Sequence, residues 1–245
     1  MKKKLLFING HLNTGGVEKA LVDVLRHIDY ERFDVDLLLL EALGDYEPQL
    51  PKAVRVILHP LQNTYGSLLP CLARCLRRRD WFSLRMRLIF LAMKIFGQKH
   101  IALAGKMLLG NRHYDCAVGF RPGICTQVAA FAADADRRIT WWHHGIINVS
   151  EHEFPEAALR CSAVSVVSDA CREMLIQKFP MLESHLVTIP NIIDTSSILR
   201  MSGGFIPYPD DQLRHIISVG SMFPNKHFLL TYQHESITDN DICFN

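Results

Sequence analysis

Short apolar runs alternate with segments of helical periodicity along most of the chain. The first run, Lys4–Asn9, is short and apolar and ends at a glycine, which is typical of a buried strand. The segment that follows, Val17–Ile28, spaces its apolar residues three and four positions apart, so they line one face of a helix. The same reasoning predicts further strands at Phe33–Leu40, Val54–Leu58, Tyr114–Phe120, Arg138–Trp142, Ala163–Ser168 and His185–Ile189.

Helices are expected between most of these strands, for example over Ala170–Phe179. A strand, a helix and a second strand at this spacing form a right-handed crossover between parallel neighbours. The sequence therefore predicts an α/β fold with a Rossmann-like, doubly wound and mostly parallel sheet, covered by helices on both faces. Residues 1–190 are assigned to this first domain.

Segment 71–112 interrupts the alternation. It is rich in large apolar residues, and ten of its residues are basic while Asp80 is its only acid, which predicts basic amphipathic helices. One interpretation is docking on an anionic membrane surface, with apolar faces at the interface. The other is an insert packed on the domain with a solvated basic face. We do not expect nucleic acid as a partner.

Residues 191–212 contain prolines and paired glycines, a composition typical of a hinge or linker. Beyond them, His215–Val219 is again a short apolar run that predicts a strand. We therefore expect residues 213–245 to form the truncated start of a second domain.

Composition narrows the class of protein. The chain has 245 residues, of which 49% are hydrophobic, enough to bury a large core. Its net charge of +2 is too balanced for a surface that wraps nucleic acid. No apolar run has membrane-spanning length, and the apolar start is too short for a signal peptide. Seven cysteines without a Cys-x-x-Cys pair favour free thiols, so we expect a cytoplasmic protein.

Gly15 and Gly16 lie between the first predicted strand and the first predicted helix. Backbone N–H groups at such a helix start can approach an anion, although a tight turn with a helix cap has the same pattern. The spacing is not Gly-x-Gly-x-x-Gly, and the Lys-Ser/Thr pair of a P-loop is missing. The glycine spacing disfavours a nucleotide-dependent oxidoreductase, and the missing Lys-Ser/Thr pair disfavours a P-loop ATPase.

His143 and His144 follow two tryptophans at the end of a predicted strand, where open α/β sheets bind their ligands. Two imidazoles beside aromatic side chains could donate hydrogen bonds to a sugar or transfer a proton. The alternative is a pair of partly exposed loop histidines. Adjacent histidines point in different directions and no third ligand has a suitable spacing, so no metal is expected.

Six strings resemble, in order and spacing, family-4 glycosyltransferases of the GT-B fold. They are Leu5–Glu18 with Phe33–Leu40, Tyr114–Phe120, Thr140–His144, Ala163–Ser168, Val187–Asp194 and Ile217–Lys226. The resemblance implies transfer of a sugar from a nucleotide-sugar to a glycan or lipid-linked acceptor. It further implies retention of configuration, no cofactor or metal, and a role in cell-surface polysaccharide synthesis at the inner face of the membrane.

The same resemblance implies roles for individual residues. His143 would lie by the transferred sugar, with His144 as its neighbour. Gly15 and Gly16 would face the donor phosphate and the acceptor, and Asn191 would contact substrate before the hinge. Lys226, in the second domain, would stabilise the departing diphosphate of the donor.

The chain also departs from the family pattern. Ser221 stands where the family usually has an arginine, and His227 stands where a glycine usually follows the lysine. After Phe228 the pattern ends, and the acidic motif that holds the donor is absent. The resemblance thus implies an acceptor-side half joined to a truncated donor half, which we expect to transfer no sugar at a useful rate. The alternative is a non-catalytic sugar- or lipid-binding module, or a partner subunit, derived from such an enzyme.

Overall fold

The computed structural model describes residues 2–143, 150 and 152–203. Predictions made for His144, Ser221, Lys226 and the strand at His215–Val219 lie outside the described residues. The chain divides into two compact units, Met1–Asp194 and Thr195–Asn245. The division falls close to the start of the predicted linker, and each unit is described by itself.

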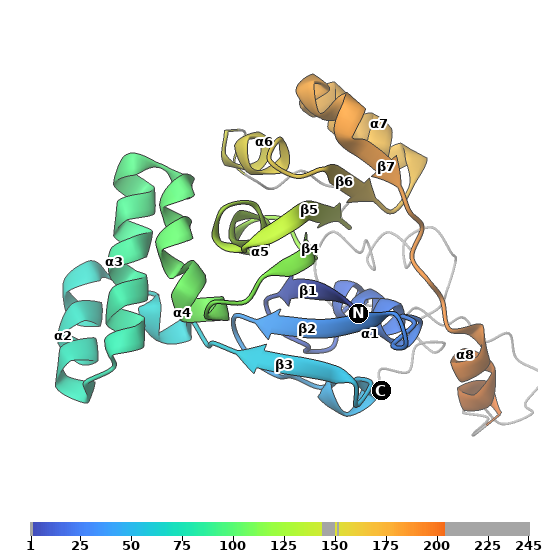
Figure 1. The fold of residues 1–245 in the computed structure, drawn as a ribbon, viewed down its shortest axis with the longest axis horizontal. Helices are drawn as coiled ribbons and strands as arrows, with labels where there is room; N and C mark the ends of the chain where they lie inside the picture. Colours follow the sequence, from blue (N-terminus) through green and yellow to red (C-terminus); the bar gives the residue numbers. More distant parts are fainter. Residues whose placement is uncertain (1, 144–149, 151, 204–245) are drawn as a thin grey trace, which may run out of the picture. The chain divides into compact units, whose positions relative to one another are not determined.

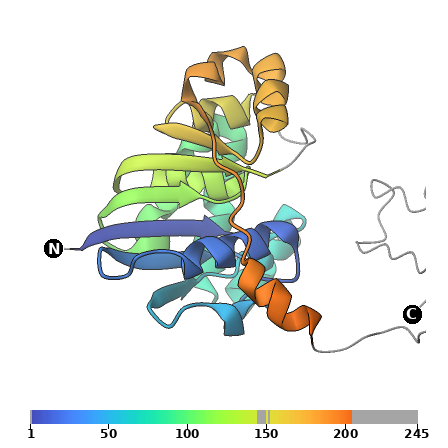
Figure 2. The ribbon, with the colours of Figure 1, turned by 90° about the vertical axis from the view of Figure 1, so that its right-hand side faces the viewer.

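The first unit is built on a sheet of seven parallel strands in the order β3-β2-β1-β4-β5-β6-β7, stacked one beside the next in Figure 2. Every neighbouring pair is parallel, so the predicted α/β class and parallel sheet are confirmed. The strands are β1 (Lys3–Asn9), β2 (Phe33–Leu39), β3 (Val54–Leu58), β4 (Tyr114–Gly119), β5 (Ala135–Trp142), β6 (Ala163–Val166) and β7 (Leu186–Thr188).

The strand order reverses between β1 and β4, which are neighbours in the sheet although they lie far apart in the sequence. In register, Leu5 of β1 lies opposite Val35 on one side and Cys116 on the other. Open α/β sheets bind their ligands outside the carboxyl ends of the strands, at such a reversal. Ligand-binding residues are therefore expected directly after β1 and β4.

One face of the sheet is covered by α1 (Gly16–Arg26), whose Leu21 and Leu25 are fully buried against Leu37 and neighbouring strand residues. This helix lies in front of the strands in Figure 2. The segment after β2 adds a short 3-10 turn, η1 (Glu47–Gln49). The alternation of side chains in β1 places Phe7 on this face and Leu6 and Ile8 on the other.

Helices on the opposite face pack against Leu6, Ile8 and Leu38. Figure 1 shows the largest of them, α2 and α3, side by side. The elements on this side are η2 (Gln62–Thr64), α2 (Leu68–Arg78), α3 (Trp81–Phe96), η3 (Gln98–Ala104), α4 (Gly105–Leu109), α5 (Ile124–Gln127) and η4 (Val128–Ala132), the last a π-helical turn. Helices thus cover both faces, as predicted.

The far end of the sheet has its own core around Trp142, Val164 and Val166. Phe154 packs on Trp142 with the two rings edge to face at 4.8 Å between centroids. The elements that build this core are α6 (Glu153–Ala158), α7 (Asp169–Lys178) and η5 (Pro180–His185).

The second unit contributes one described element, α8 (Thr195–Ser202). It lies inside segment 191–212, for which the sequence predicted a linker. The prolines and glycines of that segment fall from Gly203 onward, and the eight residues from 195 to 202 contain neither residue. A helix is therefore compatible with the local sequence.

Candidate functional site

The loop that joins β1 to α1 is held in place by the chain that follows β2. Gly10 O accepts hydrogen bonds from the backbone N–H groups of Leu40 and Glu41, and Leu12 O accepts one from Tyr46 N at 2.8 Å. Gly44, with φ +86°, packs so closely that a Cβ there would collide with the backbone of Leu12. The loop is therefore a fixed part of the sheet edge.

A carboxylate anchors the middle of this loop. Asp45 Oδ2 accepts hydrogen bonds from Thr14 N at 2.9 Å and from Thr14 Oγ1 at 2.8 Å. These bonds favour the ionised carboxylate, so they lower the pKa of Asp45 below its ordinary value.

Glu18 lies in the first turn of α1 with its side chain 5% exposed. Its Oε1 is 3.2 Å from Arg121 Nη1 and 3.7 Å from His11 Nδ1. Arg121 Nη1 also lies 3.4 Å from His11 Nε2. The acid is favoured at the helix start by the dipole, and Arg121 balances its charge. A Cβ on Gly15 would overlap Glu18 Oε2, so this carboxylate occupies the position beside the glycine pair.

Arg121 follows β4 and is positioned by two threonines. Thr126 Oγ1 donates to Arg121 O at 2.9 Å and lies 2.6 Å from Thr140 Oγ1. Because the Thr126 hydroxyl has one proton, Thr140 of β5 donates to it. A Cβ on Gly119 would lie 2.8 Å from Cys125 O, so the glycine allows α5 to approach β4. The ends of β4 and β5 are thus coupled through buried hydroxyls.

His143 follows β5 and packs against the aromatic side chains of its neighbours. Its ring centroid is 4.6 Å from that of Phe120 and 5.8 Å from that of Trp141, with the Trp141 ring nearly parallel. Phe120 directly precedes Arg121 and is fully buried. His143 therefore contacts Phe120, the residue that directly precedes Arg121 in the chain.

Glu41 completes the group of polar side chains at this edge. A Cβ on Gly10 would lie 2.9 Å from Glu41 Oε1 and 3.8 Å from Arg121 Nη1. We call these side chains the edge cluster; it consists of His11, Glu18, Glu41, Arg121 and His143. Glu18 pairs with the guanidinium and Glu41 adds a second carboxylate beside Gly10, so the cluster offers both hydrogen-bond donors and acceptors without a large net positive charge.

The predicted site residues fall at different places. Gly15 and Gly16 start α1 beside the edge cluster, and His143 belongs to it. Asn191 is exposed and follows β7, two strands beyond β5 in the sheet. Within the described ranges, no three His, Cys, Asp or Glu side chains are grouped as metal ligands.

Four residues of the edge cluster were not singled out from the sequence. Arg121 and Glu41 each come directly after a predicted strand, and His11 lies in the loop after another. Glu18 was noted only as part of the string Leu5–Glu18. Their position after parallel strands was the signal that could have identified them, because the carboxyl ends of such strands meet at one edge.

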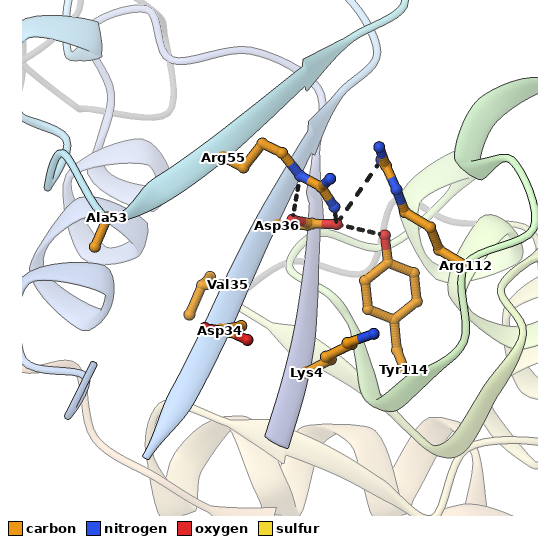
Figure 3. Close-up of a pocket in the computed structure, with 8 residues that line it drawn as sticks. All are labelled: Lys4, Asp34, Val35, Asp36, Ala53, Arg55, Arg112 and Tyr114. Atoms are coloured by element: carbon orange, nitrogen blue, oxygen red, sulfur yellow. Dashed lines mark hydrogen bonds and ion pairs between the residues drawn. The ribbon is translucent and has the colours of Figure 1, made fainter. Parts of the chain in front are cut away.

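A cavity of about 380 Å³ lies at the opposite edge, where the strands begin. Figure 3 shows Asp36 at its centre, between Arg55 and Tyr114. Arg55 binds both oxygens of Asp36, through Nε at 2.7 Å and through Nη2. Tyr114 OH donates to Asp36 Oδ2 at 2.7 Å, and Arg112 Nη1 is 4.0 Å away. Burial and the neighbouring carboxylate raise the pKa of Tyr114.

This network connects β2, β3 and β4 across the sheet. Its carboxylate is already saturated with partners, and it lies at the edge that α/β sheets do not use for ligands. We therefore assign it a structural role.

No protein-family model matches the chain, and a search of curated proteins finds no match. Solved structures of similar architecture include the three that follow. A structure of Anabaena Alr3699/HepE in complex with UDP and glucose is 20% identical, with a TM-score of 0.45 over 82% of this chain and 50% of that chain. The same protein with UDP-glucose gives 21% identity and a TM-score of 0.43 over the same shares.

The third, Phytolacca americana UGT2 complexed with UDP-2fluoro-glucose and pterostilbene, is 10% identical, with a TM-score of 0.40 over 83% of this chain and 57% of that chain. The chain thus spans about half the length of these structures.

Proposed function

We propose that the chain provides the acceptor-side half of a glycosyltransferase. The reaction moves a sugar from a nucleotide-sugar to a glycan or lipid-linked acceptor, with retention of configuration, in cell-surface polysaccharide synthesis. The proposal is supported by the resemblance to family-4 glycosyltransferases over residues 4–228 and by the edge cluster at the sheet's reversal point.

One observation carries the proposal: Arg121, after β4, lies 3.4 Å from His11, after β1, and His143, after β5, packs against Phe120, the residue that precedes Arg121. Glu18 pairs with Arg121, Glu41 adds a second carboxylate beside Gly10, and these negative charges would repel a polyanion. Such a mixture of donors and acceptors fits the neutral hydroxyl groups of a sugar better than a diphosphate. We therefore assign the cluster to the acceptor, including the helix start at Gly15.

The half-buried imidazole of His143 is the candidate for handling a hydroxyl proton, since neutral imidazole can both accept and donate near pH 7. Arg121, held by Glu18, would orient the acceptor through its remaining N–H groups. The roles proposed for His144 and Lys226 rest on the resemblance alone. A cation such as Lys226 would stabilise the charge that develops on the departing diphosphate.

The test begins with binding. The chain is titrated with a panel of neutral glycans and lipid-linked oligosaccharides by calorimetry. We expect one acceptor class to bind, and we expect His143→Ala and Arg121→Ala each to weaken it about tenfold, the value of one good hydrogen bond. Tyr114→Phe, at the opposite edge, is the matched control and should bind normally. If no glycan of the panel binds, or if all variants bind with equal affinity, the result would contradict the proposal.

Transfer is measured separately, with labelled nucleotide-sugars and the acceptor found in the first step. A labelled product whose formation depends on His143 supports the proposed glycosyltransferase activity. Binding without transfer is expected of this chain alone, because the resemblance implies a truncated donor half. The same result after residues 1–190 are joined to a complete donor half would support the alternative of a non-catalytic sugar-binding module.

A further inference from the structure

The outer face of α3 carries an exposed apolar stripe. Trp81, Arg85, Leu88, Ala92 and Ile95 follow one another at intervals of four and three residues, so they line one side of the helix. Trp81 is 59% exposed, Leu88 49% and Ile95 61%. A surface helix ordinarily presents polar residues to water on this side.

The inner face of the same helix is fully occupied by the core. Met86 and Ile89 are buried, and Phe82, Phe90 and Met93 pack against the same cluster. The outer stripe is therefore additional to what folding of the domain requires. The neighbouring α2 repeats the arrangement, because it buries Cys71 and Cys75 and leaves two of its leucines exposed to water. Leu69 is 76% and Leu76 54% exposed.

Exposed cations surround these apolar side chains, and their charge is not balanced locally. Two basic side chains turn inward, since Arg74 donates to Asn63 O and Arg87 to Gly66 O. The only acid of segment 71–112, Asp80, caps α3 by accepting a hydrogen bond from Ser83 N. Six exposed cations remain between residues 77 and 99: Arg77, Arg78, Arg79, Arg85, Lys94 and Lys99.

We infer that the outer surface of α2 and α3 binds the surface of an anionic phospholipid bilayer. Trp81, Leu88 and Ile95 would enter the headgroup region, while the cations contact lipid phosphates. Large apolar side chains between cations distinguish this surface from a nucleic-acid site, where the contacts are mainly polar. Among the described residues, no helix is long and apolar enough to cross a bilayer, so this contact lies on the surface.

Vesicle flotation of the full chain tests the inference. The vesicles contain phosphatidylcholine alone, or phosphatidylcholine with phosphatidylglycerol. We expect binding to the anionic vesicles at about 0.1 M salt and its loss at about 0.5 M, where the screening length is shorter. Neutral vesicles should bind weakly. Equal binding to both kinds of vesicle, or binding to neither, would overturn the inference.

Two sets of variants examine the two kinds of contact. Arg77→Gln with Arg85→Gln should weaken partitioning about 25-fold, since each cation near an anionic surface contributes about fivefold. Trp81→Ser with Leu88→Ser should abolish flotation by removing the apolar contact. Unchanged melting temperatures would show that these exposed positions do not affect the fold.

Matched controls use exposed residues elsewhere in the first unit. Leu159→Ser with Met181→Ser removes apolar side chains that are 45% and 55% exposed, and Lys52→Gln with Arg137→Gln removes two exposed cations. These variants should bind as the wild type does. If the control variants and the test variants bind vesicles equally, the outer surface of α2 and α3 is not the membrane-binding surface. The chain could instead bind no vesicles and form a dimer that Trp81→Ser dissociates. That result would assign the surface to contact with a second copy of the chain. The inference does not depend on the proposed function, because flotation is measured without any sugar.

Discussion

Arg121 and Glu18 join the end of β4 to the first turn of α1 through an ion pair of 3.2 Å between Nη1 and Oε1. The pair crosses the point where the strand order reverses, and Arg121 also reaches His11 in the loop after β1. The two loops that flank the reversal are thereby held as one unit.

Replacing Arg121 by alanine should destabilise the fold. Glu18 would keep a nearly buried carboxylate without its cation, a situation that costs about 1–3 kcal/mol. Urea unfolding monitored by circular dichroism measures the loss. The double variant Arg121→Ala with Glu18→Gln should recover part of it, because the buried charge is gone. A double variant less stable than the sum of the two single changes would contradict the pairing.

Tyr114→Phe should lower the free energy of unfolding by about 1 kcal/mol, because Asp36 loses one hydrogen bond but keeps Arg55. Glycan affinity should stay at the wild-type value, since Tyr114 lies at the edge where strands begin. Loss of affinity in this variant, with the fold intact, would show that the large cavity takes part in binding.

His113 should give the stability of the protein a pH dependence near neutrality. Its ring nitrogens lie 3.2 Å from Asp134 and 3.2 Å from Asp136, and these carboxylates raise the pKa of His113 above 6.5. The protonated form is favoured by folding, so its contribution is complete below pH 6.5 and is lost as the pH rises through the raised pKa. NMR titration of the imidazole measures this pKa. Asp134→Asn with Asp136→Asn should return it toward 6.5, and a wild-type pKa at or below 6.5 would refute the contact.

Cys125 and Cys161 should resist alkylation in the folded protein. Burial raises the pKa of each thiol to about 12. At pH 8 the thiolate fraction is then roughly a thousandfold smaller than for an ordinary cysteine, and the side chains are also shielded. Peptide mapping after iodoacetamide treatment should find both cysteines unmodified in buffer and modified in urea. Rapid labelling in buffer would show that the core around these two cysteines opens.

Much of the fold could be predicted because each strand contains a short apolar run. The ends of the strands are predicted less well, as the start of β5 shows. β5 was predicted from Arg138, whereas it begins at Ala135 and pairs there with Tyr114. Asp136 and Arg137 are exposed, so the strand start carries no apolar signal, and only pairing with β4 defines it.

The candidate site was predictable only where its residues form a local pattern. His143 and the pair Gly15-Gly16 stand out in the sequence as neighbours of strands. Arg121 and Glu18 are isolated charged residues separated by 103 positions, and the sheet order alone makes them partners. The sequence predicts that the sheet is parallel, but it does not determine which strands become neighbours.

The location of sugar binding is the central claim, and NMR mapping tests it most directly. The chain is labelled at its histidine and arginine side chains and titrated with the acceptor glycan that calorimetry identifies. We predict shifts of the His11 and His143 imidazoles and of the Arg121 guanidinium, while Arg55 beside Asp36 stays unchanged. Shifts at Arg55 and Arg112 without any at the edge cluster would contradict the account.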